Sequence, residues 1–165
     1  MEHRGLAVLE KFSRLVEATS AVLAGGLLII NIVDIVMGIV FRYVLKNSVI
    51  WTEEVARYSL VWLVMLGAAG ALAKGDHMAI DFLVPKFPGW LKKTSEVLRL
   101  GIQLVVLFVL IWYGAMNVRG TWHMKTMALG IPKAIVLMAV PLGMSILLLQ
   151  LVILEFIKAR KDENK

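Results

Sequence analysis

The chain contains no cysteine and only three histidines among its 165 residues. The missing thiols exclude disulfides, thiolate metal sites and thiol redox chemistry. His3, His77 and His123 all lie outside the long apolar runs, so the sequence offers no paired haem ligands within a membrane. Phosphate-binding glycine loops, a GxSxG nucleophile elbow and an HExxH metal motif are missing too. We therefore expect no enzyme activity, no catalytic residue, no cofactor and no metal site.

Charge is also scarce, and long apolar runs take its place. Charged residues make up 18% of the chain against 59% apolar residues, and the mean hydropathy is +0.80. A helix needs about 20 apolar residues to cross a bilayer. Four runs reach that length, at about 21–41, 55–73, 97–118 and 134–157. The sequence predicts an all-α integral membrane protein with four transmembrane helices, folded as a single membrane domain over residues 1–165.

The net charge of +6 is explained by membrane topology. Most of the lysines and arginines lie in the two tails, residues 1–20 and 158–165, and in the second of the three connecting loops. Cytoplasmic segments collect basic residues, and an even number of spans puts both termini on one side. We expect both tails to be cytoplasmic and expect the lipid bilayer, not nucleic acid, as the medium in contact with the chain.

The segment before the first span is amphipathic. Over residues 6–19, Phe12 and Leu15 share an apolar face, while Glu10 and Arg14 form a favourable i,i+4 pair on another. We predict a short interfacial helix that lies on the cytoplasmic surface. A simple extension of the first span into water is the alternative.

Polar residues form a stripe on the first span. Asn31, Asp34, Gly38 and Arg42 follow one another at helical spacing and so share a face. The large apolar residues of this span, at about −0.3 to −0.6 kcal/mol each, outweigh one aspartate at about +3 kcal/mol, so insertion is favoured. The stripe fits either an ion pathway or polar contacts between helices. Because Asp34 is the one clear acid within a span, we favour the contacts and predict that these residues lie at a subunit interface.

Small residues and a proline shape the other spans. The run Gly67-Ala68-Ala69-Gly70-Ala71 lets another helix approach closely, so Gly67 and Gly70 are further interface candidates. Pro141 is expected to bend the fourth span and to leave the carbonyl of Leu137 without its helical donor. We expect a static bend rather than a hinge.

The first external loop leads into a charged helix start. Thr52 is suited to be the N-cap, Glu53 and Glu54 fall in the first turn where the helix dipole favours acids, and Arg57 can meet Glu53 at i+4. Trp51 suits the membrane–water interface. The cluster either only begins the second helix or also forms a docking surface. In the second loop, His77 and Asp81 make at most a weak pair, since a third metal ligand is missing.

Several phrases of the sequence, taken in order, match one family. They are Phe41-Arg42-Tyr43, Trp51-Thr52-Glu53-Glu54, Ala56-Arg57-Tyr58, Gly67-Ala68-Ala69, His77-Met78-Ala79-Ile80-Asp81, Leu129-Gly130-Ile131-Pro132 and Val140-Pro141-Leu142-Gly143. Together they resemble the small membrane subunit of tripartite ATP-independent periplasmic (TRAP) transporters, the DctQ-like family.

The resemblance implies an accessory subunit of a secondary active transporter in the bacterial or archaeal cytoplasmic (inner) membrane. Such transporters import organic acids such as C4-dicarboxylates or sugar acids. The implied partners are a large multi-spanning membrane subunit, which this chain would scaffold, and a periplasmic substrate-binding protein. Trp51, Glu53, Glu54 and Arg57 are then candidates for docking the binding protein. The alternative is a self-assembling small channel or exporter, in which Asp34 lines a pore formed by several copies.

Overall fold

The computed structural model describes residues 2–47, 49–73 and 89–163, and its elements in that part of the chain are helices. The loop that contains His77 and Asp81 lies outside the described residues. The helices are α1 (Glu2–Tyr43), α2 (Ile50–Ala73), α3 (Gly89–Gly120), the short α4 (Lys133–Leu137) and α5 (Ala139–Glu163).

Four helical segments are long and apolar enough to cross a membrane, which confirms the predicted spans. They run Val8–Tyr43, Ile50–Leu72, Thr94–Gly120 and Lys133–Arg160. Each extends beyond the apolar run read from the sequence, because a helix continues into the interface after its side chains become charged or polar. The second helix, for example, begins at Ile50, so Thr52 lies in its first turn and is not the N-cap that we predicted.

A separate interfacial helix is not present, since α1 is one helix of 42 residues from Glu2 to Tyr43. The structure therefore has the continuous extension that was the alternative. Its physical reason is the face that α1 buries: Ser13 and Ser20 are buried, while Phe12 and Leu15 remain exposed. The small polar side chains allow close contact with the rest of the protein, and this contact keeps the N-terminal part of the helix in line with the span.

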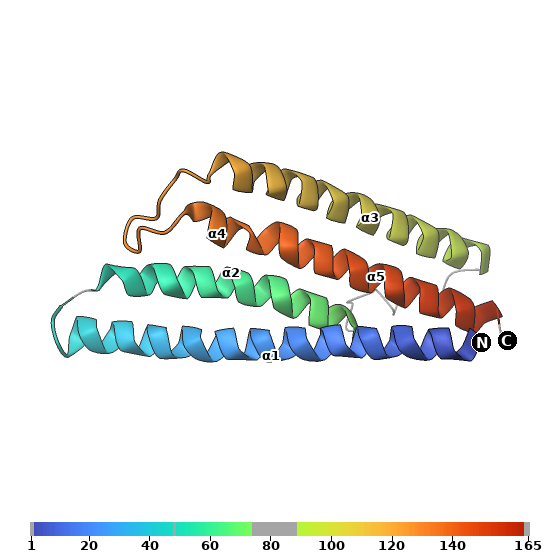
Figure 1. Cartoon of the computed structure of the whole chain (residues 1–165), viewed down its shortest axis with the longest axis horizontal. Coiled ribbons are helices and arrows are strands. Elements are labelled where there is room, and N and C mark those ends of the chain that lie inside the picture. Colours follow the sequence, from blue (N-terminus) through green and yellow to red (C-terminus); the bar gives the residue numbers. More distant parts are fainter. Residues whose placement is uncertain (1, 48, 74–88, 164–165) are drawn as a thin grey trace.

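The helices form a row in the order α1, α2, α5, α3 (Figure 1). α1 packs on α2, α2 packs on α5, and α5 packs on α3. A row leaves much of every helix uncovered, so few apolar side chains are buried and many large ones are exposed. Apolar exposure of this kind is expected where lipid is the solvent.

Both termini lie at the same end of the long helices, which we call the terminal end (Figure 1). The α1–α2 and α3–α4 connections lie at the opposite end, which we call the loop end. This is the arrangement expected for an even number of spans. Polar contacts tie the terminal end together: the fully buried Gln150 donates from Nε2 to Ser13 Oγ at 2.6 Å, joining α5 to α1. Arg99 of α3 pairs with Glu155 of α5 at 3.5 Å.

Two glycines set the distances between neighbouring helices. A Cβ on Gly143 of α5 would lie 2.6 Å from the Cβ of Met65 and 3.1 Å from its carbonyl oxygen, so α2 and α5 touch almost backbone to backbone. A Cβ on Gly114 of α3 would lie 3.2 Å from Cδ of Pro141. The contacts on both sides of α5 therefore depend on the absence of a side chain.

The fourth span is divided at the place where we predicted a bend. α4 ends at Leu137 and α5 begins at Ala139, with Met138 between them. The break lies one turn before Pro141, because this proline has no N–H to offer the carbonyl of Leu137. Pro141 itself fits within the first turn of α5, where the missing donor matters least.

We predict that Gly143→Ala destabilises the protein by about 1–3 kcal/mol, because the new methyl group must push α5 away from the backbone of α2. Equilibrium unfolding in detergent micelles measures the change. Gly101→Ala is the matched control, since a Cβ there meets nothing within 4 Å. Equal stability of the two variants would show that the α2–α5 contact is less tight than described.

Candidate functional site

The polar stripe of α1 faces α2, and its first member is fully engaged there. Asn31 is buried and donates from Nδ2 to the carbonyl oxygen of Ala56 at 2.7 Å and to Ser59 Oγ at 2.8 Å. Ser59 donates in turn to Ala56 O. Side-chain hydrogen bonds between membrane helices typically contribute about 0.6 kcal/mol and at most about 2 kcal/mol. Asn31 therefore fixes the register of α1 against α2 more than it stabilises the pair.

Asp34, one turn further along α1, is 5% exposed. Its Oδ2 atom is buried without a hydrogen-bond partner among the described residues. Gly38 follows one turn later, and a Cβ there would lie 3.1 Å from Thr52 Oγ1. The absence of a side chain at Gly38 thus lets α2 approach α1 beside Asp34. The Thr52 hydroxyl donates to the carbonyl oxygen of Val49 at 2.8 Å.

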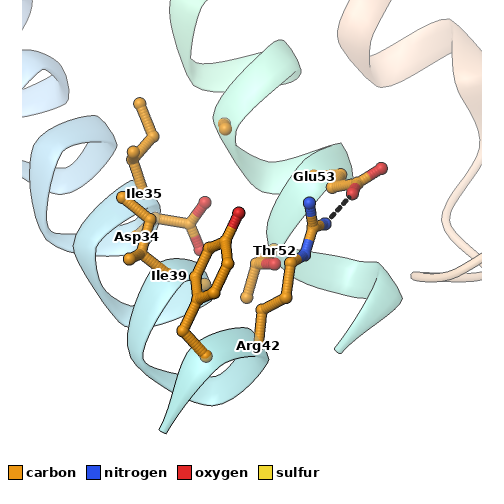
Figure 2. A pocket seen from close by; sticks show the side chains of 9 residues that line it. Asp34, Ile35, Ile39, Arg42, Thr52 and Glu53 are labelled. Atoms are coloured by element: carbon orange, nitrogen blue, oxygen red, sulfur yellow. Dashed lines mark hydrogen bonds and ion pairs between the residues drawn. The ribbon is translucent and has the colours of Figure 1, made fainter. Parts of the chain in front are cut away.

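The stripe ends in an ion pair at the loop end. Arg42 of α1 reaches across to Glu53 of α2 (Figure 2). Both side chains are about half exposed, so this pair contributes little to stability. The sequence suggested Arg57 as the partner of Glu53 through i,i+4 spacing. The structure joins Glu53 to Arg42 instead, because the closeness of α1 and α2 around Gly38 brings Arg42 within reach.

These residues enclose a groove between α1 and α2 with a volume of about 280 Å³. Figure 2 shows the Asp34 carboxylate turned toward the space between the two helices. The lining residues are Asp34, Ile35, Gly38, Ile39, Arg42, Tyr43, Thr52, Glu53 and Ala56.

Glu54 has a role that sequence reasoning missed. Its two carboxylate oxygens accept hydrogen bonds from the backbone N–H groups of Met127 and Leu129, at 3.0 Å each. Glu54 therefore holds the loop between α3 and α4 from the start of α2. A single sequence carries no signal that links Glu54 to backbone groups more than 70 residues away.

The loop that Glu54 holds is an ordered turn. Thr126 N donates to Ile131 O at 2.8 Å, and Lys133 N donates to Met124 O at 2.8 Å. Gly130 has a φ of +66°, a conformation that glycine adopts without strain. At the tip, the side chain of Met127 is 97% exposed. The phrase Leu129-Gly130-Ile131-Pro132 thus belongs to a hydrogen-bonded turn that presents an apolar tip beyond the helices.

The remaining predicted residues lie at two places. Gly67 and Gly70 face α1, where a Cβ would come 3.9 Å from Cβ of Ala24 and 3.6 Å from Cβ of Ser20, respectively. Their close approach is therefore within the chain. Trp51 is exposed at the loop end, and Arg57 is exposed two turns further along α2, next to Ala56 of the groove. The residues that the structure describes include no group of three His, Asp or Glu side chains that could hold a metal ion.

Comparison with known proteins identifies relatives. Residues 31–161 match the family described as "Tripartite ATP-independent periplasmic transporters, DctQ component". The C4-dicarboxylate TRAP transporter small permease protein DctQ of Rhodobacter capsulatus is 25% identical over 118 residues, which cover 70% of this chain and 52% of that protein. The sialic acid TRAP transporter small permease protein SiaQ of Vibrio cholerae is 29% identical over 108 residues, or 62% of this chain and 59% of SiaQ.

A third relative is larger. The sialic acid TRAP transporter permease protein SiaT of Haemophilus influenzae is 34% identical over 91 residues, which are 54% of this chain but only 15% of SiaT. The chain thus covers less than two thirds of the length of each of these three relatives.

We predict that Glu54→Ala loosens the α3–α4 loop, because Met127 and Leu129 lose the acceptors of their N–H groups. Hydrogen exchange at these two amides should become several-fold faster, while exchange in the middle of α2 stays unchanged. Glu53→Ala is the control, since it removes a neighbouring carboxylate that pairs with Arg42 only. Equal exchange in both variants would show that Glu54 does not hold the loop.

Proposed function

Because the chain belongs to the DctQ component family of TRAP transporters, we propose that it is the small membrane subunit of such a transporter and supports a larger transport subunit. It acts as an interaction protein, without catalysis and without a complete solute pathway of its own.

The sequence similarity to a part of SiaT is the observation that supports this proposal most directly. A segment similar to this chain forms a small part of a permease polypeptide that is several times longer. The relative therefore has such helices covalently attached to the rest of a permease. A separate chain of the same kind would make the corresponding contacts as a subunit, and we propose a large multi-spanning TRAP subunit as its partner.

The internal contacts support an accessory role. A solute site in a membrane needs several polar groups that converge on one place. Here, by contrast, Asn31 and Gln150 are engaged with neighbouring helices of the same chain. The polar residues within the described spans mainly hold the row of helices together, and the row offers broad apolar faces to a partner or to lipid.

A role in a TRAP transporter also implies an orientation in the membrane and a class of transported solute. We propose that the terminal end faces the cytoplasm, because its tails are basic, and that the loop end faces the periplasm. Two relatives are named for C4-dicarboxylates and sialic acid, which are both carboxylates. We propose a carboxylate as the solute of the complete transporter, with substrate selectivity residing in the other proteins.

The loop end is the proposed docking surface for a periplasmic substrate-binding protein. Glu53 and Glu54 are engaged with Arg42 and with the α3–α4 loop, so they shape this end of the protein. Trp51, Arg57 and the tip residue Met127 are exposed beside them. We propose that these three make the direct contacts, with the long Arg57 side chain extending toward the loop end, while Glu53 and Glu54 position the surface.

Co-expression of the tagged chain with a large TRAP membrane subunit from the same organism tests the scaffold role. We expect the two proteins to co-purify in mild detergent, and we expect deletion of this chain to abolish uptake. Recovery of the chain alone together with full uptake in the deletion strain would contradict the proposal. Solute flux in liposomes that contain only this chain would favour the self-assembling channel instead.

We predict that Arg57→Glu raises the KM for uptake of the solute bound to its binding protein, with little change in complex yield, because a charge on the docking surface mainly affects encounter. Uptake by reconstituted complexes at increasing concentrations of binding protein measures this KM. Arg14→Glu, an identical charge change at the terminal end, is the control. Unchanged kinetics in Arg57→Glu would remove this residue from the docking surface.

A further inference from the structure

Asp34 is a buried acid without a complete set of partners among the residues that the structure describes. Its side chain is 5% exposed, and Oδ2 is left without a hydrogen bond among the described residues. The one basic side chain on its stripe, Arg42, is engaged with Glu53. A carboxylate in this position needs a positive or hydrogen-bonding group from outside the chain, because an unpaired charge is unfavourable away from water.

A positive or hydrogen-bonding group from outside the chain can reach Asp34 through the groove. Ile35 and Ile39 line it, and both are about half exposed on the surface of α1, so the groove lies open beside them. Its volume of about 280 Å³ far exceeds the share of one water molecule in the liquid, about 30 Å³. An extended lysine or arginine side chain fits in this space with its apolar stem against the two isoleucines.

The depth of Asp34 argues against a lipid headgroup as the occupant. Arg42, whose ion pair is half exposed, marks the polar level of α1 at the loop end. Asp34 lies eight residues away, about 12 Å along the helix axis. The ammonium group of a lipid lies near the polar level, whereas a side chain on a neighbouring helix can be placed at any depth.

A bare metal cation is also a poor match. Such ions take several oxygen ligands. Besides Asp34, the groove lining offers one other carboxylate, Glu53, and this one is already paired with Arg42. A basic side chain requires fewer partners, since one carboxylate can pair with it.

We infer that this groove receives a lysine or arginine side chain from a helix of the large transport subunit, and that its cation pairs with Asp34. The inference rests on the proposed function, and it names the place and the chemistry of one contact between the subunits. Ile35 and Ile39 flank the entry and pack against the incoming helix.

Site-specific photo-crosslinking tests where the partner lies. A photoreactive amino acid replaces Ile39 at the groove or Val33 on another side of α1, two positions that are 52% and 53% exposed. We expect Ile39 to crosslink to the large subunit in the intact complex at a segment that contains a lysine or arginine, and Val33 to crosslink several-fold less. Equal crosslinking, or no crosslink from Ile39 in an intact complex, would overturn the inference.

Asp34→Asn tests the charge, because it preserves the size of the side chain. We expect roughly tenfold lower recovery of the complex, as one member of a buried charge pair is removed. We also expect the isolated chain to lose no thermal stability, since Oδ2 has no partner among the described residues and the substitution removes a buried charge. Replacing the crosslinked basic residue of the partner by alanine should have the same effect, and combining the two substitutions should add little further loss.

The outcomes separate this inference from the proposed function. A wild-type chain that never co-purifies with the large subunit would contradict the scaffold role itself. An intact complex whose yield is unaffected by Asp34→Asn would leave the scaffold role standing and remove the charge pair. A lipid or metal ion that native mass spectrometry finds on the isolated wild-type chain, and that is lost in Asp34→Asn, would also overturn the inference.

Discussion

Helices in lipid gain almost nothing from hiding leucines from one another, because the surrounding hydrocarbon is equally apolar. Association must then come from close contact and from a few hydrogen bonds, and this constraint explains the interior of the protein. Gly143 lets α5 approach the backbone of α2, while hydrogen bonds of Asn31 and Gln150 join α1 to α2 and to α5, respectively. The row therefore holds together through small and polar residues, and its large apolar residues mostly face outward.

Sequence patterns predicted the features that depend on local order along the chain. Apolar length gave the four spans, helical spacing gave the stripe from Asn31 to Arg42, and the missing N–H of Pro141 gave the divided fourth span. The sequence did not decide the structure of the N-terminal segment, because an amphipathic pattern fits both a helix on the membrane surface and one continuous with the span. The choice depended on Ser13 and Ser20, which are buried in the protein.

Contacts between distant segments could not be predicted. Spacing favoured Arg57 as the partner of Glu53, yet Arg42 on another helix takes that place. Glu54 suited a helix start equally well with or without the loop that it holds. Both outcomes depend on the order and distance of the helices, which periodicity does not contain. The stripe consequently contains a mixture: Asn31 is engaged within the chain, whereas Asp34 faces a groove that is open to the outside.

The hydrogen bond between Ser13 and Gln150 has a consequence for how the protein is made. Its two members are 137 residues apart and belong to the first and last helices to leave the ribosome. Ser13 therefore cannot form this hydrogen bond until synthesis is nearly finished and α5 is made. A chain that lacks α5 would keep the contact between α1 and α2 but would leave the N-terminal part of α1 without this bond to the rest of the protein.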